Sequence, residues 1–141
     1  MALMLPEVAR PPLTLLSEEE QLLRQTVREF AEQELAPRAR PMDEAGQMDP
    51  DLITQLFELG VMGVEVPEKW GGTAASFFTA VLVVEELSRV DPAVGVLVDV
   101  QNTLVNNCIL KYGTEEQKER YLPRLTRDTV GSYALSEAGS G

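Results

Sequence analysis

Apolar positions recur with the period of an α-helix along most of the chain. The first such stripe contains Leu22, Leu23, Thr26, Val27, Phe30 and Ala31. Start signals precede several of these runs: Ser17-Glu-Glu-Glu20 and Thr114-Glu-Glu-Gln117 have the pattern of a capping box, and Asp91 stands before Pro92 as an N-cap. The pattern therefore predicts about five helices, over residues 17–35, 50–59, 76–89, 91–113 and 114–125.

Three of these helices carry a more specific expectation. Pro37 should end the first helix near Leu35, because proline lacks a backbone N–H. The helix over 76–89 is apolar nearly all round in its first ten residues, so it should lie centrally. The stretch GVLVDV at 95–100 alternates like a strand, but the start and stop signals that bracket 91–113 favour a helix.

The end of the chain has a different pattern. Residues 130–136 alternate with period two, which predicts a strand, and small residues follow it as in a turn. The expected fold class is therefore all-α, a bundle of about five helices that ends in the first strand of a truncated β domain. We expect a loose N-terminal arm over 1–16, a helical domain over 17–128 and the start of the β domain over 129–141.

Composition excludes several classes of function. Twelve basic and 23 acidic residues give a net charge of −11, which disfavours a nucleic acid or an anionic membrane surface as partner. One cysteine and no histidine rule out an internal disulfide and a Ser-His or Cys-His catalytic pair, and they predict that the chain holds no metal. No apolar run is long enough to predict a membrane span.

Two polar or aromatic positions admit alternative interpretations. Trp70 lies in a glycine-rich loop, where it either tucks into the core or borders a ligand cavity. Asp99 lies within a run of valines, so it either faces water on a side shared with Asn102 and Asn106 or points into a substrate pocket. Glu85-Glu86 should form surface or interhelix ion pairs.

Four segments together resemble the N-terminal part of acyl-CoA dehydrogenases. They are VPEKWGGT (66–73), EELSRVDPAV (85–94), YGTEEQKERYLPRL (112–125) and VGSYALSEAGSG (130–141). MDEAGQMD and VLVDVQNTL are similar to the short/branched-chain subgroup. The resemblance implies a flavoprotein that oxidises short or branched-chain acyl-CoA thioesters to 2-enoyl-CoA with FAD.

The resemblance also assigns site residues. FAD would contact the segment Tyr133, Ala134, Leu135, Ser136, Glu137, Ala138, Gly139, Ser140 and Gly141. Within it, Tyr133, Leu135 and Ser136 would run past the isoalloxazine ring. Val96, Val98 and Asp99 would line the inner end of the acyl pocket. The family's catalytic glutamate lies in a C-terminal domain, so no residue here is predicted to be catalytic and the chain alone is expected to be inactive.

The resemblance finally implies partners and a location. They are an acyl-CoA substrate, an electron-transfer flavoprotein and a homotetramer of the full-length protein, in a bacterial cytoplasm or a mitochondrial matrix. Two alternatives stay open. One is an acyl-CoA oxidase or related flavin monooxygenase on the same scaffold, and the other is a non-catalytic helical interaction module.

Overall fold

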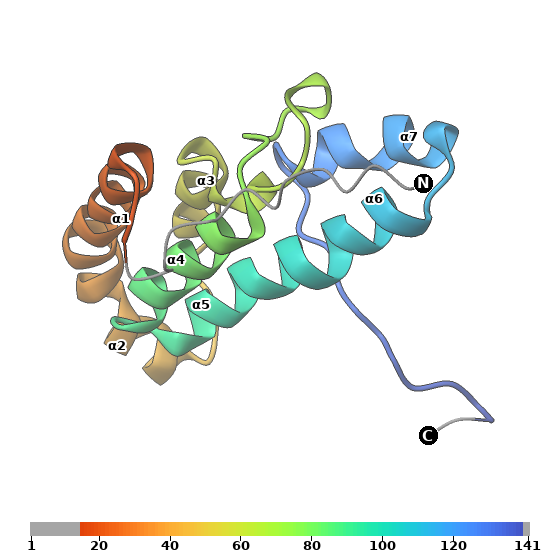
Figure 1. Ribbon diagram of the computed structural model, residues 1–141. Helices are drawn as coiled ribbons and strands as arrows, with labels where there is room; N and C mark the ends of the chain where they lie inside the picture. Colours follow the sequence, from red (N-terminus) through yellow and green to blue (C-terminus); the bar gives the residue numbers. More distant parts are fainter. Residues whose placement is uncertain (1–14, 140–141) are drawn as a thin grey trace.

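Five continuous helices form the part of the chain that the structure describes, residues 15–139 of the computed structural model (Figure 1). Two of the five are composite and contain a π-helical stretch. They are α1 (Glu18–Phe30) with η1 (Ala31–Leu35) and α2 (Ala36–Ala45), and α5 (Pro92–Asp99) with η4 (Val100–Asn106) and α6 (Asn107–Tyr112). The others are α3 (Pro50–Glu58), α4 (Phe77–Ser88) and α7 (Glu115–Leu125), and two 3₁₀ turns, η2 (Val61–Gly63) and η3 (Glu68–Trp70), follow α3. The all-α fold and the number of helices are confirmed, and GVLVDV is helical.

The predicted helix starts are also confirmed. At α1 the hydroxyl of Ser17 accepts from the amide of Glu20 at 3.1 Å, and the Glu20 carboxylate accepts from the Ser17 amide at 2.8 Å. Thr114 and Gln117 make the same reciprocal pair at α7. Such pairs satisfy amides that a helix leaves free in its first turn, which is why the sequence marks these boundaries so clearly.

The expectation that Pro37 ends the first helix was wrong. The amide of Ala36 donates to the carbonyl of Ala31, five residues back, so the helix widens into a π turn just before the proline. A proline normally clashes with the carbonyl four residues earlier, and a wider turn relieves that crowding. The helix therefore continues to Ala45 and ends at Gly46, whose φ of 61° is left-handed.

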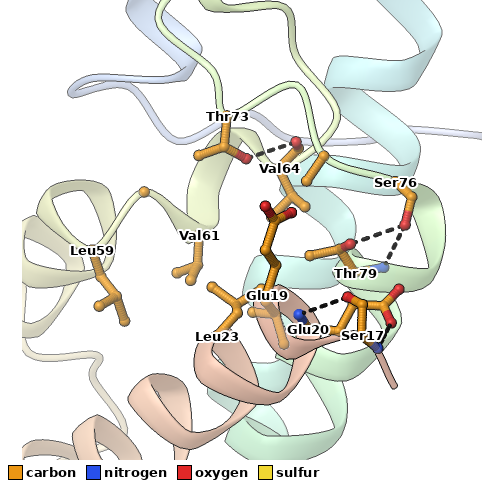
Figure 2. Close-up of a pocket in the computed structure, with 13 residues that line it drawn as sticks. Ser17, Glu19, Glu20, Leu23, Leu59, Val61, Val64, Thr73, Ser76 and Thr79 are labelled. Carbon is orange, nitrogen blue, oxygen red and sulfur yellow. Dashed lines mark hydrogen bonds between the residues drawn. The ribbon is translucent and has the colours of Figure 1, made fainter. Parts of the chain in front are cut away.

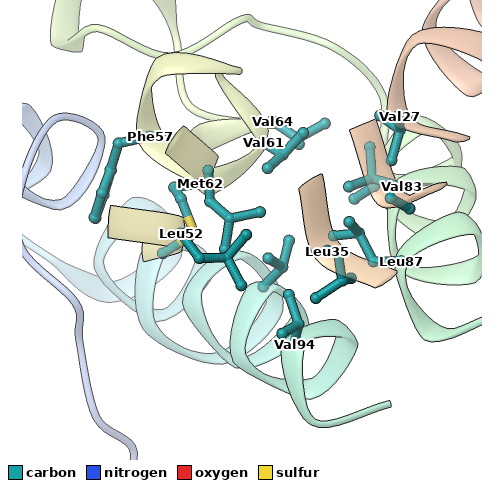
Figure 3. Packing of buried hydrophobic residues seen from close by; sticks show 14 of the residues in the cluster. Val27, Leu35, Leu52, Phe57, Val61, Met62, Val64, Val83, Leu87 and Val94 are labelled. Atoms are coloured by element: carbon teal, nitrogen blue, oxygen red, sulfur yellow. The ribbon is translucent and has the colours of Figure 1, made fainter. Parts of the chain in front are cut away.

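The main core lies where α1, η1, α3, η2, α4 and α5 meet (Figure 3). Its buried apolar side chains include Val27, Leu35, Leu52, Leu56, Val61, Met62, Val83, Leu87, Val94 and Val98. The helix α4 packs against both α1 and α5, as expected of a central helix. It still leaves Phe77 and Val81 exposed, and Leu22 of the predicted α1 stripe is 70% exposed. An apolar pattern alone thus overstated how much of these helices the core covers.

Trp70 belongs to a second, smaller core. Its ring is buried against Val66 and Leu122, with Ile109 and Leu110 packed beside them. The hydroxyl of Thr126, at the end of α7, donates to the Trp70 carbonyl at 2.8 Å. The simpler interpretation of Trp70, a turn that tucks its aromatic side chain into the core, is confirmed.

The strand predicted over 130–136 does not form. Residues 131–136 have no regular secondary structure, and the segment leads away from the helices in Figure 1. A strand needs a neighbouring backbone to hydrogen-bond with, and the described residues offer none along this stretch. Residues 1–14 of the expected arm lie outside the described part of the chain.

The long helix Pro92–Tyr112 passes a test for membrane spans by length and composition, with 21 residues and a mean hydropathy of 1.3. A core helix of a globular protein meets the same criteria. This helix contacts α4, α7 and η2, and it buries the amide side chains of Gln101, Asn102 and Asn106 against them. A third of its apolar window is buried inside the domain, so packing accounts for part of its apolar character.

Candidate functional site

The residues expected to meet ligands lie around η4, the π-helical stretch in the middle of the long helix. A π turn changes the directions of the side chains that follow it, and such turns are frequent at functional sites. Here η4 separates Asp99, at the end of α5, from Asn107, at the start of α6. Side chains of η4 face both the helical core and the C-terminal segment.

Asp99 borders a pocket between α4 and α5. The pocket has a volume of about 330 Å³, and its lining residues are Phe77, Ala80, Val81, Val84, Glu85, Asp99 and Thr103. The Asp99 carboxylate accepts from the Thr103 hydroxyl at 3.1 Å. Asp99 thus lines a pocket, and that this pocket receives a substrate stays a prediction.

The other interpretation, a wet face shared with Asn102 and Asn106, was wrong for the two asparagines. Both are buried and brace the loop that follows α3. Asn102 donates to the Val61 carbonyl and accepts from the Val64 amide, each at 2.8 Å. Asn106 donates to the Met62 carbonyl at 2.9 Å. Two amides four residues apart on an apolar helix are the sequence feature that could have indicated this bracing role.

The structure does not bring Val96 and Val98 together with Asp99. Val98 is fully buried in the main core, whereas Val96 is 59% exposed. Neither lines the pocket beside Asp99. Residues two apart point to nearly opposite sides of a helix, which the shared valine run concealed. That either valine lines an acyl pocket stays a prediction.

A wider groove joins this pocket at Thr103 and leads to Tyr133. It encloses about 590 Å³, and its lining residues are Glu65, Thr103, Leu104, Asn107, Cys108, Leu110, Lys111, Tyr112 and Tyr133. The amide of Asn107 donates to the Glu65 carboxylate at 2.7 Å across it. Thr103 lines both the pocket and the groove, so the two are neighbours on the long helix.

The segment expected to contact a flavin is exposed. Residues 132–139 lie on the surface, and Tyr133 keeps about half of its side chain accessible. Along 132–136 the backbone N–H groups have no partner among the described residues, and a Cβ on Gly139 would meet nothing within 4 Å. Amides without a partner among the described residues, the Ser136 hydroxyl and an unobstructed glycine fit one polar edge of a flavin ring. Ser140 and Gly141 lie outside the described residues.

A third pocket, which the sequence did not predict, lies between α1 and the start of α4 (Figure 2). Its volume is about 370 Å³. Leu23, Leu59, Val61 and Val64 provide apolar lining, and Ser17, Glu19, Glu20, Thr73, Ser76 and Thr79 provide polar lining. Figure 2 shows the Glu19 side chain pointing toward the pocket. The apolar lining suits an apolar group, and the acidic side chains at its edge suit neutral or positive groups around that group.

A family model described as the acyl-CoA dehydrogenase N-terminal domain matches residues 17–129. The chain belongs to the acyl-CoA dehydrogenase family.

Curated relatives within this family share nearly half of the sequence. The chain is 48% identical over 130 residues to a probable short/branched chain specific acyl-CoA dehydrogenase of Dictyostelium discoideum, covering 92% of this chain and 32% of the relative. It is 47% identical to the mitochondrial short/branched chain specific acyl-CoA dehydrogenase of Bos taurus, with 92% and 30% covered. The chain thus spans about a third of the length of these relatives. The resemblance drawn from the four motifs, including its lean toward this subgroup, is confirmed.

Solved structures agree on the acyl-CoA dehydrogenase fold. Butyryl-CoA dehydrogenase from Megasphaera elsdenii superposes with a TM-score of 0.82 at 32% identity, covering 90% of this chain and 34% of that one. A chain in the structure of the electron transferring flavoprotein of Acidaminococcus fermentans superposes with a TM-score of 0.84 at 37% identity, with 90% and 34% covered.

Glu86 is the most buried carboxylate among the residues that the structure describes, and it belongs to an ion-pair network. Arg28 donates to both of its oxygens, at 2.7 and 2.9 Å, and Arg89 donates at 2.8 Å. The hydrogen bond from Arg28 lowers the pKa of Glu86 below its ordinary value, Arg89 adds to this effect, and burial opposes it. A carboxylate held ionised in this way is a poor proton acceptor. The predicted interhelix ion pair is confirmed for Glu86, whereas Glu85 forms no ion pair with the described residues. Among the described residues, no cluster of metal-ligating side chains occurs.

Proposed function

We propose that the chain is the N-terminal part of a flavoprotein acyl-CoA dehydrogenase that oxidises short or branched-chain acyl-CoA thioesters to 2-enoyl-CoA. The observation that carries this proposal is the 47–48% identity to short/branched chain specific acyl-CoA dehydrogenases over 92% of the chain. Because the chain spans a third of those relatives, the reaction belongs to the longer protein. We take residues 17–128 as the helical domain and 129–141 as the start of the β domain.

FAD is the cofactor of this proposal, and the family is generally one of flavoproteins. When bound, it would accept a hydride from the β carbon of the substrate. The backbone of Tyr133 to Ser136 would donate to the polar edge of the ring, and the small residues Gly139, Ser140 and Gly141 would let the chain approach the cofactor closely. The exposed position of 132–139, and amides of 132–136 that have no partner among the described residues, support the assignment.

The acyl group would lie against the pocket between α4 and α5. Its lining includes Phe77, Val81 and Val84, and a volume of about 330 Å³ suits a short or branched chain. The family resemblance assigns the α proton to a glutamate outside this chain. The described carboxylates beside the pocket, Glu85 and Asp99, would belong to its helical wall. We therefore expect the 141-residue chain alone to be inactive.

Oxidation of the substrate would leave two electrons on the flavin, and these must pass to an acceptor. We propose that the acceptor is an electron-transfer flavoprotein. The pocket between α1 and α4 offers apolar side chains surrounded by polar ones, as surfaces that receive a partner's side chain commonly do. A homotetramer is the proposed assembly. Mitochondrial relatives and a Bacillus subtilis relative are compatible with either a mitochondrial matrix or a bacterial cytoplasm.

The test begins with the intact mass of the protein from its natural source, followed by isolation of the full-length form. We expect bound FAD, whose visible absorption bleaches under anaerobic conditions with butyryl-, isobutyryl- or 2-methylbutyryl-CoA. Pivaloyl-CoA, which has no α hydrogen, is the matched control and should cause no bleaching. Absence of flavin, or no bleaching by any acyl-CoA, would overturn the proposal. Rapid oxygen uptake during turnover would instead identify an acyl-CoA oxidase.

A further inference from the structure

The side chain of Gln101 holds the point where the chain leaves the helices. Gln101 is fully buried in η4. Its amide nitrogen donates to the Leu125 carbonyl at 2.7 Å and to the Thr129 carbonyl at 3.0 Å. Its amide oxygen accepts from the Gly131 amide at 2.7 Å. The three partners are the last residue of α7 and two residues of the stretch that leads from α7 to the C-terminal segment.

The contact between Gln101 and residue 131 requires a residue without a side chain at position 131. A Cβ at position 131 would overlap the side chain of Val105, one turn of helix beyond Gln101. Only a glycine lets the backbone come close enough for its N–H to reach the Gln101 oxygen without moving Val105. Hydrogen bonding and close packing thus act on the same residue from the same helix.

We infer that Gln101 is a positioning residue for the flavin-facing segment Tyr133–Ser136. This inference rests on the proposed function. Beyond Gly131, the backbone of 132–136 makes no hydrogen bond to the rest of the described chain. Among the described residues, Gly131 is thus the last backbone contact before Tyr133, which lines the groove together with Thr103 and Asn107. A flavin bonded to the backbone of this segment would be held in register with the α4–α5 pocket through Gln101.

The first experiment examines the hydrogen bond between Gln101 and Gly131 without any cofactor, in the 141-residue chain. Gln101→Met keeps the length of the side chain and removes both kinds of hydrogen bond. Amide exchange of Gly131, measured relative to the amide of Leu122 in α7, should become faster by about tenfold or more. The matched control is Asn102→Leu, which removes a buried amide of the same helix that braces a different loop. It should leave this ratio unchanged. Equal ratios in Gln101→Met and the wild type would overturn the inference.

A second pair of variants keeps Gln101 intact. Gly131→Ala should speed exchange of the residue 131 amide in the same way, because the added methyl group drives the segment from Val105. Val105→Ala in the same chain makes room for it and should restore most of the protection. Failure of the second substitution to restore protection would show that close approach at 131 does not hold the segment.

The third experiment uses the flavin-loaded full-length protein. Both Gln101→Met and Gly131→Ala should alter the visible circular dichroism of the flavin and weaken FAD binding by about tenfold. They should lower kcat more than they change KM, because the acyl pocket itself is untouched. Wild-type spectra and FAD affinity in both variants would overturn the inference. If instead the wild-type protein holds no flavin, the proposed function fails, and exchange at Gly131 still reports on the contact between Gln101 and Gly131.

Discussion

Glu86 is a charged residue inside a helical core, with its side chain only 2% exposed. Two arginines reach it from the surface. Arg28 belongs to α1, and Arg89 is the C-cap residue of α4. Removing one partner from a buried ion pair is usually costly, because the remaining group loses its compensation. Here the arginines are about half exposed and can turn to water. Removing the charge of Glu86 should therefore cause only a moderate loss of stability.

We expect Glu86→Gln to lower the free energy of unfolding by about 1–3 kcal/mol, since it weakens two charge-assisted hydrogen bonds between α1 and α4 and a third from Arg89 at the end of α4. Urea denaturation measures the change. Glu85→Gln is the matched control, because Glu85 stands next to Glu86 in the sequence but is exposed, and that change should stay within about 0.5 kcal/mol. Equal effects of the two substitutions would contradict a structural role for this ion pair.

The same residue predicts a dependence of stability on pH. The pKa of Glu86 is lowered in the folded protein, first by the hydrogen bond from Arg28. A carboxyl group of this kind contributes stability above its unfolded-state pKa, near ~4.3, and that contribution disappears as the pH falls through the folded-state pKa. The stability gap between wild type and Glu86→Gln should therefore be constant near neutral pH and shrink in acid. Urea midpoints of both proteins across this range measure it, and a gap that widened on acidification would have the wrong sign.

At the scale of elements, the closest helix contact lies between α4 and α5. A Cβ placed on the buried Gly95 would overlap the Ser88 hydroxyl and come within 3.1 Å of the Ser88 Cβ. The two helices are joined by only a few residues, so neither can shift far without disturbing the other. A glycine is required here by the neighbouring helix and not by its own backbone angles.

Gly95→Ala should therefore destabilise the domain. Overpacking costs about 1–3 kcal/mol, which outweighs the gain of about 1 kcal/mol in helix propensity. Ser88→Ala alone should be nearly neutral, and combining it with Gly95→Ala should recover part of the loss. A double-mutant cycle by urea denaturation measures this coupling. Strict additivity of the two substitutions would mean that the helices do not meet at these residues.

The elements also show how far local sequence signals reach. Capping boxes and helix periods located the five helices, because these signals act within one or two turns of chain. The π stretches were not predictable, since the wide turn before Pro37 depends on a backbone shift rather than on a residue pattern. The buried roles of Gln101, Asn102 and Asn106 were missed for a related reason: their partners are carbonyls and amides far away in sequence.

For the whole molecule, α4 and the long helix share a surface that the described core does not cover. Phe77 and Val81 of α4, and Val96 and Leu104 of the long helix, are exposed. Single exposed apolar residues are ordinary, but several on adjacent helices mark a contact surface. The chain spans about a third of its relatives, and in the proposed full-length enzyme the substrate and the β domain would lie on this side.

The isolated 141-residue chain should consequently bind a hydrophobic dye and self-associate weakly through this surface. Replacing Phe77 with Ser and Val81 with Thr should lower dye fluorescence and the sedimentation-derived mass, because both side chains lie on the exposed side of α4. Leu22→Ser is the matched control: Leu22 is even more exposed, but it stands on α1 away from this surface, so its loss should change neither measurement. If Leu22→Ser had the larger effect, the contact surface would lie on α1, and the pocket beside Glu19 would become the place to look for the rest of the protein.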